Sequence, residues 1–267
     1  MAFRGRVALV TGAARGLGRL AARRLAASGV GVVAVDVDEP GLVETARHAP
    51  NVETHLLDVT DAAAIEATVR DVEARLGPVD RLVHAAAIAP AGRLADQPAE
   101  LVHRAMTVNY GGTVNTVFAV VPSMLERNRG DLVLFGSLAG WMPTPGLGAY
   151  TASKFAVVGL AEVLAMELGQ SSLRLCCACP ALVDTPMVDE IDRDLPVTGQ
   201  PRLAPEIVLD SIERGLELGE HFVFPGPTAA VAVRARRFVP GLVRRRLTSV
   251  LGGARPGDLL ASHQPHQ

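Results

Sequence analysis

A lone lysine close to a tyrosine is the first feature of this chain that could do chemistry. Lys154 is the only lysine among 26 Lys and Arg residues, so all the others are arginine. An ammonium is a compact, titratable charge, whereas a guanidinium is a broad planar fork that stays protonated. Lys154 lies four residues after Tyr150, one of only two tyrosines, which indicates a site that needs the small head group. The alternative is an ordinary lysine on a solvated face.

A glycine-rich segment near the N-terminus could bind phosphate. Residues 11–18 read Thr-Gly-Ala-Ala-Arg-Gly-Leu-Gly and follow the apolar run 7–10. Glycines at a strand-to-helix turn allow a pyrophosphate to approach closely, and the next helix N-terminus supplies free N–H groups and a positive dipole end. The G-x-x-x-G-x-G spacing differs from the common G-x-G-x-x-G fingerprint. Alone, the turn could be only a tight connection, but its place after the first strand of a βα series favours a dinucleotide.

Asp36 ends the second apolar run, residues 30–35. An acidic residue at this position accepts hydrogen bonds from the adenosine ribose hydroxyls, and its charge repels a 2′-phosphate. Arg15 acts in the opposite direction, because a guanidinium in the glycine-rich turn could contact a phosphate. We therefore expect NAD(H) as the favoured cofactor, with NADP(H) as the alternative.

Alternating strands and helices must position these residues. Helical patterns such as 17–27, 62–76 and 149–168 separate continuous apolar runs, which are typical of strands buried on both faces. The expected strands are 7–10, 30–35, 52–57, 81–84, 132–135, 173–178 and 221–224. Repeated βα units imply a parallel sheet with helices on both faces. The predicted fold class is α/β: a single-domain, Rossmann-type, doubly wound parallel sheet of about seven strands, plus a C-terminal helical extension.

Composition limits the class of protein. The 267 residues are 49% hydrophobic and 20% charged, enough for a large core, and the formal net charge of −2 argues against a nucleic-acid partner. Cys176, Cys177 and Cys179 lie in an apolar run and fit no common zinc spacing. We expect them to be buried, reduced thiols, with no metal site and a cytoplasmic location. We expect no signal peptide and no transmembrane helix.

These motifs, in this order, resemble the classical short-chain dehydrogenase/reductase family. The resemblance runs from Arg6 to about Phe224 and rests on residues 11–18, Asp36, Asp58 with Val59, Asn109, Ser137, Tyr150-x-x-x-Lys154 and residues 180–185. It implies an oxidoreductase that acts on CH–OH and C=O groups with NAD or NADP. It also implies a catalytic domain over residues 1–224. We expect residues 225–260 to form a helical extension packed on that domain and residues 261–267 to be a disordered tail.

The resemblance implies a catalytic set formed by Asn109, Ser137, Tyr150 and Lys154. Tyr150 would be the general acid/base; a phenol has an ordinary pKa of about 10, so it needs a nearby cation to act near neutrality. Lys154, one helical turn later, would supply that charge and hydrogen-bond the nicotinamide ribose. Ser137 would hydrogen-bond the substrate oxygen, and Asn109 would hold a water in the proton relay.

Two sets of binding residues also follow from the resemblance. The cofactor would contact Gly12, Ala14, Arg15, Gly16, Leu17, Gly18, Asp36, Asp58, Val59, Ala85, Ala86, Ala87, Tyr150, Lys154, Pro180, Val183 and Thr185. The small-molecule substrate would lie in a mostly apolar pocket lined by Leu138, Trp141, Met142, Leu147, Leu182 and Met187. Such a pocket fits a lipophilic secondary alcohol or ketone.

Two departures from the family pattern affect the expected cofactor site. Residues 84–87 read His-Ala-Ala-Ala, where the family usually has Asn-Asn-Ala-Gly. This removes two bracing amides and places the methyl of Ala87 where glycine lets the cofactor approach. We expect His84 to brace the strand end rather than to act as a second base. Ala181 stands where glycine is usual and should not abolish binding.

The region after Phe224 mixes arginines with apolar residues and has no acidic residue between Glu220 and Asp258. We interpret it as helices packed on the substrate cleft or on a partner subunit, and contact with an anionic membrane surface is the alternative. Family members often associate through two long helices, here about 98–127 and 149–168, so we expect a homodimer or homotetramer. A non-catalytic nucleotide-binding or lipid-surface protein is the other functional class, which the complete catalytic set argues against.

Overall fold

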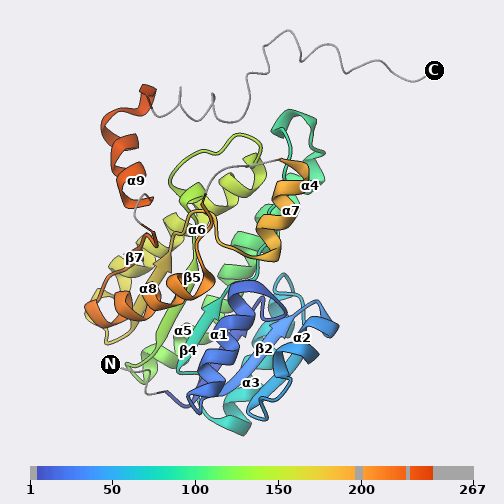
Figure 1. The fold of residues 1–267 in the computed structure, drawn as a ribbon. Coiled ribbons are helices and arrows are strands. Elements are labelled where there is room, and N and C mark those ends of the chain that lie inside the picture. Colours follow the sequence, from blue (N-terminus) through green and yellow to red (C-terminus); the bar gives the residue numbers. More distant parts are fainter. Residues whose placement is uncertain (1–4, 196–200, 227–228, 243–267) are drawn as a thin grey trace, which may run out of the picture.

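Seven parallel strands form one sheet at the centre of the computed structural model (Figure 1). The structure describes residues 5–195, 201–226 and 229–242. The strand order is β3-β2-β1-β4-β5-β6-β7. The strands are β1 (Val7–Thr11), β2 (Gly31–Asp36), β3 (Val52–Leu56), β4 (Arg81–His84), β5 (Asp131–Phe135), β6 (Arg174–Ala178) and β7 (Phe222–Val223). This confirms the predicted α/β parallel sheet, and each strand overlaps its expected apolar run.

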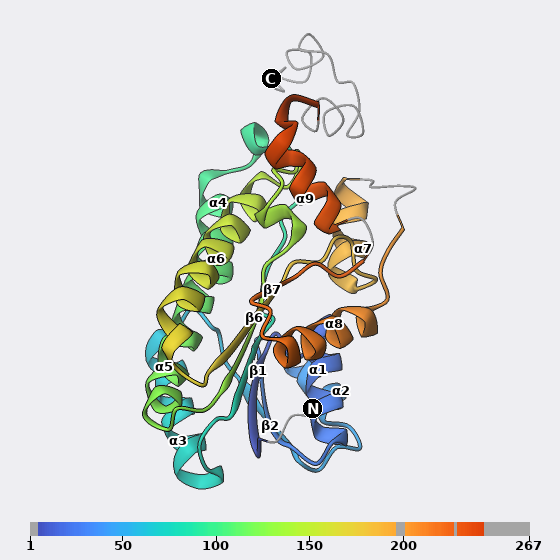
Figure 2. The same cartoon turned by 90° about the vertical axis from the view of Figure 1, so that its left-hand side faces the viewer.

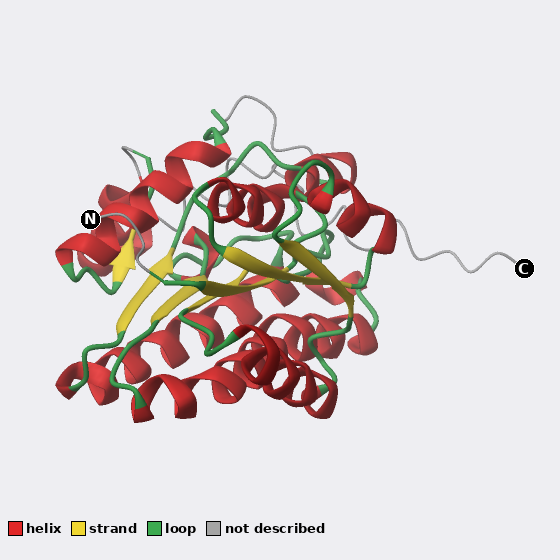
Figure 3. Cartoon of the chain, turned by 90° about the horizontal axis from the view of Figure 1, so that it is seen from below, coloured by secondary structure: helices red, strands yellow, loops and turns green. Residues whose placement is uncertain are grey.

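Helices cover both faces of the sheet (Figures 2 and 3). One layer consists of α3 (Ala62–Leu76), α5 (Gly112–Glu126) and α6 (Gly148–Glu167). The other consists of α1 (Gly16–Ala27), α2 (Glu39–Ala46) and α8 (Pro205–Leu218). The remaining α-helices of the described ranges are α4 (Ala99–Met106), α7 (Pro186–Asp194) and α9 (Ala229–Phe238). No helix within those ranges carries an apolar stretch long enough to cross a bilayer.

The alternation of side chains along each strand explains the continuous apolar runs. Successive residues point to opposite faces, so Leu9 packs beneath α3, α5 and α6, while its neighbours Ala8 and Val10 pack beneath α1 and α8. Both faces of the central strands are therefore buried, as predicted. The same prediction is wrong for β3, where the Leu56 side chain is 60% exposed. β3 is one of the two edge strands of the sheet and lacks a neighbouring strand on one side.

The strand order creates a binding site beyond the carboxyl ends of the strands. β1 pairs with β2 on one side and with β4 on the other, so the loops that follow β1 and β4 diverge. In open parallel sheets, ligands bind at such a switch point, beyond the carboxyl ends of the strands. The glycine-rich turn, Asp36, the 84–87 segment and Ser137 all follow strand ends and therefore meet there.

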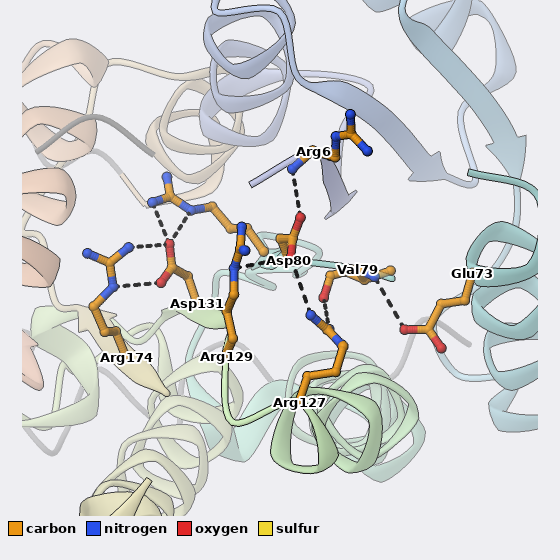
Figure 4. A network of polar contacts seen from close by, with 9 residues as sticks. Arg6, Glu73, Val79, Asp80, Arg127, Arg129, Asp131 and Arg174 are labelled. Atoms are coloured by element: carbon orange, nitrogen blue, oxygen red, sulfur yellow. Dashed lines mark hydrogen bonds and ion pairs between the residues drawn. The ribbon is translucent and has the colours of Figure 1, made fainter. Parts of the chain in front are cut away.

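Buried ion pairs lie at the amino ends of the strands, where β4, β5 and β6 begin (Figure 4). Asp131 is paired in register with Arg81 on one side and Arg174 on the other. Its carboxylate accepts hydrogen bonds of 2.8 Å from Arg81 Nη2 and 2.7 Å from Arg174 Nε. Next to it, Asp80 accepts from the Arg6 backbone N–H at 2.7 Å and pairs with Arg127 at 3.3 Å.

We predict that Asp131→Ala destabilises the protein by about 3 kcal/mol, the lower end of the cost of breaking a buried ion pair, because the buried Arg81 guanidinium loses this carboxylate but keeps Glu213. Urea unfolding would measure the loss. Asp210→Ala is the matched control, since Asp210 also pairs with an arginine, Arg24, but its side chain is exposed. Exposed pairs contribute less than about 1 kcal/mol. A similarly small change for both variants would contradict the prediction.

Candidate active site

A cavity of about 1040 Å³ opens at the carboxyl ends of the strands. Its walls include every predicted cofactor residue except Ala14 and every predicted substrate residue except Trp141. Ser137, Tyr150 and Lys154 also line it, whereas Asn109 is buried outside the lining. Residues that are distant in the sequence are thus gathered around one space large enough for a cofactor and a substrate.

The glycine-rich turn lies directly against the loop after β4. Gly12 has a φ of +64°, and a Cβ added there would lie 2.6 Å from the backbone nitrogen of Ala86. A side chain at Gly12 is therefore excluded both by the backbone conformation and by space. Gly16 begins α1 and lines the cavity, so the N–H groups of the first turn of α1 are available to a phosphate.

The carboxylate of Asp36 is fixed by backbone donors. It accepts hydrogen bonds from the N–H groups of Ala14 at 2.9 Å, Val37 at 2.8 Å and Asp38 at 3.1 Å. Ala14 thus does not line the cavity but holds Asp36 in place. The Asp36 side chain is therefore held in one orientation where it lines the cavity.

Arg15 is paired with a carboxylate across the cavity. Its guanidinium donates to both Glu190 oxygens on α7, at 2.5 and 3.2 Å. This hydrogen bond is the main reason that the pKa of Arg15 is raised. The side chain connects the glycine-rich turn to α7, and its charge is already matched, which weakens the case for Arg15 as a 2′-phosphate ligand.

His84 braces the end of β4, as predicted. Its Nδ1 lies 2.9 Å from Thr11 Oγ1 on β1 and 2.9 Å from Thr116 Oγ1 on α5. Burial lowers the pKa of His84 to about 3, and the charge of Lys154 acts in the same direction. The imidazole is therefore neutral near pH 7 and connects two strands to a helix. Ala85, Ala86 and Ala87 follow it along the cavity wall.

Tyr150, Ser137 and Lys154 converge where β5 meets α6. Tyr150 and Lys154 lie on the first two turns of α6, and Lys154 Nζ is 5.6 Å from the centre of the Tyr150 ring. Ser137 follows β5, and its side chain forms a hydrogen bond with the Tyr150 side chain. Lys154 Nζ donates to the Phe135 carbonyl oxygen at 2.7 Å. The serine and tyrosine hydroxyls can therefore face the same substrate oxygen.

Burial controls the titration of the tyrosine and the lysine. It raises the pKa of Tyr150 to about 12, although the hydrogen bond with Ser137 opposes that rise. It also lowers the pKa of Lys154 to about 8. The expected lowering of the Tyr150 pKa by Lys154 is therefore not found in the protein alone, because desolvation of the phenolate outweighs the effect of nearby groups.

Asn109 lies in a π-helical turn, Thr107–Gly111, between α4 and α5. The predicted long helix 98–127 is thus interrupted, as is common near functional sites. The Asn109 amide accepts from the Ile88 N–H at 2.8 Å and donates to the Ile88 carbonyl at 2.9 Å and to Ser153 Oγ at 2.8 Å. Both amide protons are used, so the side chain fixes the loop after β4 against α6, and a water would have to bind at another atom.

Trp141 packs away from the cavity that it was predicted to line. Its ring makes edge contacts with Phe222 at 5.4 Å and Phe224 at 5.6 Å between centroids. Its Nε1 donates to Cys179 Sγ at 3.2 Å, and the Ser137 backbone N–H donates to the same sulfur. The three cysteines are free and buried, as predicted.

Several wall residues were not predicted from the sequence. They are Pro186 at the start of α7 and five residues of α9 and the segment after it: Val231, Ala232, Ala235, Val239 and Leu242. Val188, Ile191 and Leu195 also line the cavity, and they fall in the segment 187–201, which the resemblance predicts as a wall. A usable signal existed for α9, since Val231, Ala235, Val239 and Leu242 recur at intervals of three or four residues, typical of one face of a helix. α9 falls within the predicted helical extension, most of which lies outside the described residues, as does the predicted tail.

Comparison with known proteins gives the family. The short chain dehydrogenase family model matches residues 6–196. A 3-alpha-(or 20-beta)-hydroxysteroid dehydrogenase of Mycobacterium tuberculosis is 35% identical over 234 residues, which cover 85% of this chain and 90% of the relative. An uncharacterised NAD-dependent oxidoreductase of the same organism is 38% identical over 203 residues, which cover 69% of this chain and 74% of the relative.

Solved structures show the same likeness. A short-chain dehydrogenase/reductase from Burkholderia phymatum in complex with NAD has a TM-score of 0.82 at 26% identity, covering 91% of this chain and 96% of the other. A short-chain dehydrogenase from Mycobacterium paratuberculosis bound to NAD has a TM-score of 0.73 at 31% identity, covering 82% and 95%. This chain belongs to the short-chain dehydrogenase family and is an oxidoreductase.

Proposed function

We propose that this protein interconverts an apolar secondary alcohol and its ketone with NAD(H), using Tyr150 as general acid/base. The observation that carries the proposal is the convergence of Tyr150, Ser137 and Lys154 on the cavity that the glycine-rich turn and Asp36 also line. A nucleotide site and a proton-transfer site thus share one space. The solved relatives with NAD and the relative described as NAD-dependent support the choice of cofactor.

Ser137, Tyr150 and Lys154 would each have a separate role in the reaction. Ser137 and Tyr150 hydrogen-bond the substrate oxygen, which replaces the bond that they make with each other. In oxidation, the Tyr150 oxygen takes the hydroxyl proton, and in reduction it returns that proton. Lys154 holds a positive charge next to the tyrosine ring and is positioned to bind the nicotinamide ribose. Bound NAD(H) supplies the hydride chemistry at the carbinol carbon.

The fixed carboxylate of Asp36 favours NAD over NADP. The glycine-rich turn and α1 would hold the pyrophosphate, and Asp58 and Val59 would hold the adenine. An NADP(H)-dependent ketoreductase is the alternative, but it would bring a 2′-phosphate next to Asp36 while Arg15 is engaged by Glu190.

We predict that the wild type binds NAD at least about 10-fold more tightly than NADP, since opposed like charges disfavour binding. Asp36→Ser should reduce that preference, and calorimetric titration with both nucleotides would measure it. Glu39→Ser, a change at an exposed acid nearby, is the control and should keep the preference. Tighter binding of NADP by the wild type would contradict the role given to Asp36.

The apolar walls support a lipophilic substrate. Leu138, Met142, Leu147, Leu182 and Met187 line the cavity close to the catalytic candidates. The relatives described as hydroxysteroid dehydrogenases point in the same direction. The test is a panel of hydrophobic secondary alcohols and ketones with NAD(H), read at the nicotinamide absorbance. Turnover of sugars or amino acids in preference to this panel would refute the substrate class.

Two other features of the proposal concern assembly and location. α5 and α6 expose large apolar side chains, including Phe118 and Met166, which supports a homodimer through these helices, alone or as part of a tetramer. The free cysteines are consistent with a reducing compartment such as the cytoplasm.

A non-catalytic nucleotide-binding or lipid-surface protein is the remaining alternative, and the intact Ser137, Tyr150 and Lys154 arrangement argues against it.

A further inference from the structure

α9 forms a wall of the cavity that the catalytic chemistry does not require. Figure 2 shows it above the carboxyl ends of the strands, between α7 on one side and α4 and α6 on the other. Five residues from this part of the chain, Val231, Ala232, Ala235, Val239 and Leu242, line the cavity. On the side of α7, the lining is also apolar, with Met187, Val188 and Ile191. We call the space between these two walls the outer compartment.

The wall formed by α9 is apolar but largely uncovered by protein. The exposed fractions are 61% for Val231, 45% for Val239 and 68% for Leu242. By contrast, Val188 and Ile191 on α7 are buried. When an apolar ligand covers exposed apolar side chains in a cavity, the apolar surface is removed from water, which favours binding. The outer compartment therefore suits the apolar body of a large substrate, beyond the carbon that reacts.

Arg236 attaches α9 to the catalytic region. Its Nη1 donates to the Trp141 carbonyl oxygen, and its guanidinium lies 5.3 Å from the centre of the Phe155 ring. Hydrogen bonding and stacking at once suit the planar guanidinium. Both partners adjoin catalytic candidates, since Phe155 follows Lys154 and Trp141 ends the short turn that begins at Ser137.

The attachment point for Arg236 is itself fixed. Trp141 Nε1 donates to Cys179 Sγ, which also accepts the Ser137 backbone N–H, and the indole packs between Phe222 and Phe224. The main chain at Trp141 is thus held in place at the end of the turn that follows Ser137. A contact with the Trp141 carbonyl sets the distance of α9 from the reacting groups.

We propose that Arg236 is a specificity-determining residue, which fixes α9 as a wall of the outer compartment so that the enzyme accepts extended apolar alcohols and ketones of polycyclic size. This inference rests on the proposed function and names the substrate class of that site. Arg236 acts by positioning α9, and it does not touch the reacting atoms. Compact substrates would occupy the space near Tyr150 and make little use of the wall.

The test compares selectivity between two substrates. For Arg236→Ala and Arg234→Ala, kcat/KM is measured with NAD for a polycyclic alcohol such as a hydroxysteroid and for a compact one such as cyclohexanol. Arg234 is the matched control because it is exposed on the same helix. We expect the ratio of the two kcat/KM values to fall about 10-fold in Arg236→Ala, as for one lost charged hydrogen bond, and to stay unchanged in Arg234→Ala. An unchanged ratio in Arg236→Ala would overturn the proposal.

A second measurement separates this proposal from the proposed function. Binding of the neutral apolar dye Nile red to the NAD-loaded protein reports on the outer compartment without turnover. Weaker binding in Arg236→Ala than in Arg234→Ala supports the compartment even if no alcohol in the panel is oxidised, whereas equal binding in both variants counts against it. Ala235→Trp fills the compartment without removing Arg236. It should shift both the selectivity ratio and dye binding in the same direction, and failure to shift either would overturn the proposal.

Discussion

Tyr150→Phe is expected to lower kcat by about 10²–10⁴-fold, the usual contribution of a positioned general acid/base. The substitution removes one oxygen and leaves the ring in place beside Lys154. The hydroxyl that is lost bonds to Ser137, and Tyr150 lines the cavity. The substitution therefore removes the group that would exchange the substrate proton. Steady-state rates at the nicotinamide absorbance would measure the loss, with an alcohol that the wild type oxidises.

Tyr110→Phe is the natural control, since Tyr110 is the other tyrosine of the chain. It should retain most of the activity. Calorimetric binding of NAD to Tyr150→Phe should persist, because the turn, Asp36 and α1 are untouched. Undiminished turnover in Tyr150→Phe would show that the proton goes elsewhere. Loss of NAD binding at an unchanged unfolding temperature would show that the Tyr150 hydroxyl acts mainly by binding the cofactor.

The place of the site in the fold could be predicted because parallel strands put all their carboxyl ends at one edge. The sequence places each group of site residues at the end of a strand or on the helix that follows it: residues 11–18, Asp36, Ser137 and the Tyr150–Lys154 pair. This placement alone predicts that they lie close together. Local spacing also predicted that Tyr150 and Lys154 share a face of α6, which the structure confirms.

Contacts between distant segments could not be predicted in this way. The direction of Trp141 depends on a turn of three residues after Ser137 and on the aromatic residues of the last strand region. The bond between Arg15 and Glu190 joins positions 175 residues apart. The wall supplied by α9 depends on Arg236 reaching a main-chain carbonyl. A sequence pattern records residue types, whereas each of these contacts depends on the relative placement of two packed elements.

The energetics of Lys154 point to function rather than stability. Its folded pKa of about 8 lies below the ordinary value of 10.5 because the side chain is buried. Between pH 8 and pH 10.5 the unfolded chain binds more protons at Lys154 than the folded chain does. The free energy of unfolding therefore rises with pH across that window, and it falls as the pH is lowered towards 8. Near pH 7 the buried ammonium therefore opposes folding. Of the 26 Lys and Arg side chains, 25 are arginine, and the one lysine lies in the candidate active site, where its burial opposes folding.

Lys154→Arg is accordingly expected to reduce kcat/KM by at least about 100-fold, although both side chains are cations. Lys154 is nearly fully buried, and its Nζ donates to the Phe135 carbonyl at 2.7 Å. The space around it is thus fitted to a slender head group, and a planar guanidinium would displace the carbonyl contact or the Tyr150 ring. Steady-state kinetics over pH 6–10 would measure the effect.

The pH profile distinguishes loss of this charge from a merely structural effect. In the wild type, deprotonation of Lys154 near pH 8 should produce a break in the rate. A guanidinium does not titrate in that range, so residual activity in Lys154→Arg should lack the break. Arg234→Lys, the reverse exchange at an exposed position, should leave rate and profile unchanged. Near-normal turnover in Lys154→Arg would mean that the site needs only a positive charge, and the single lysine of the chain would then have no chemical cause.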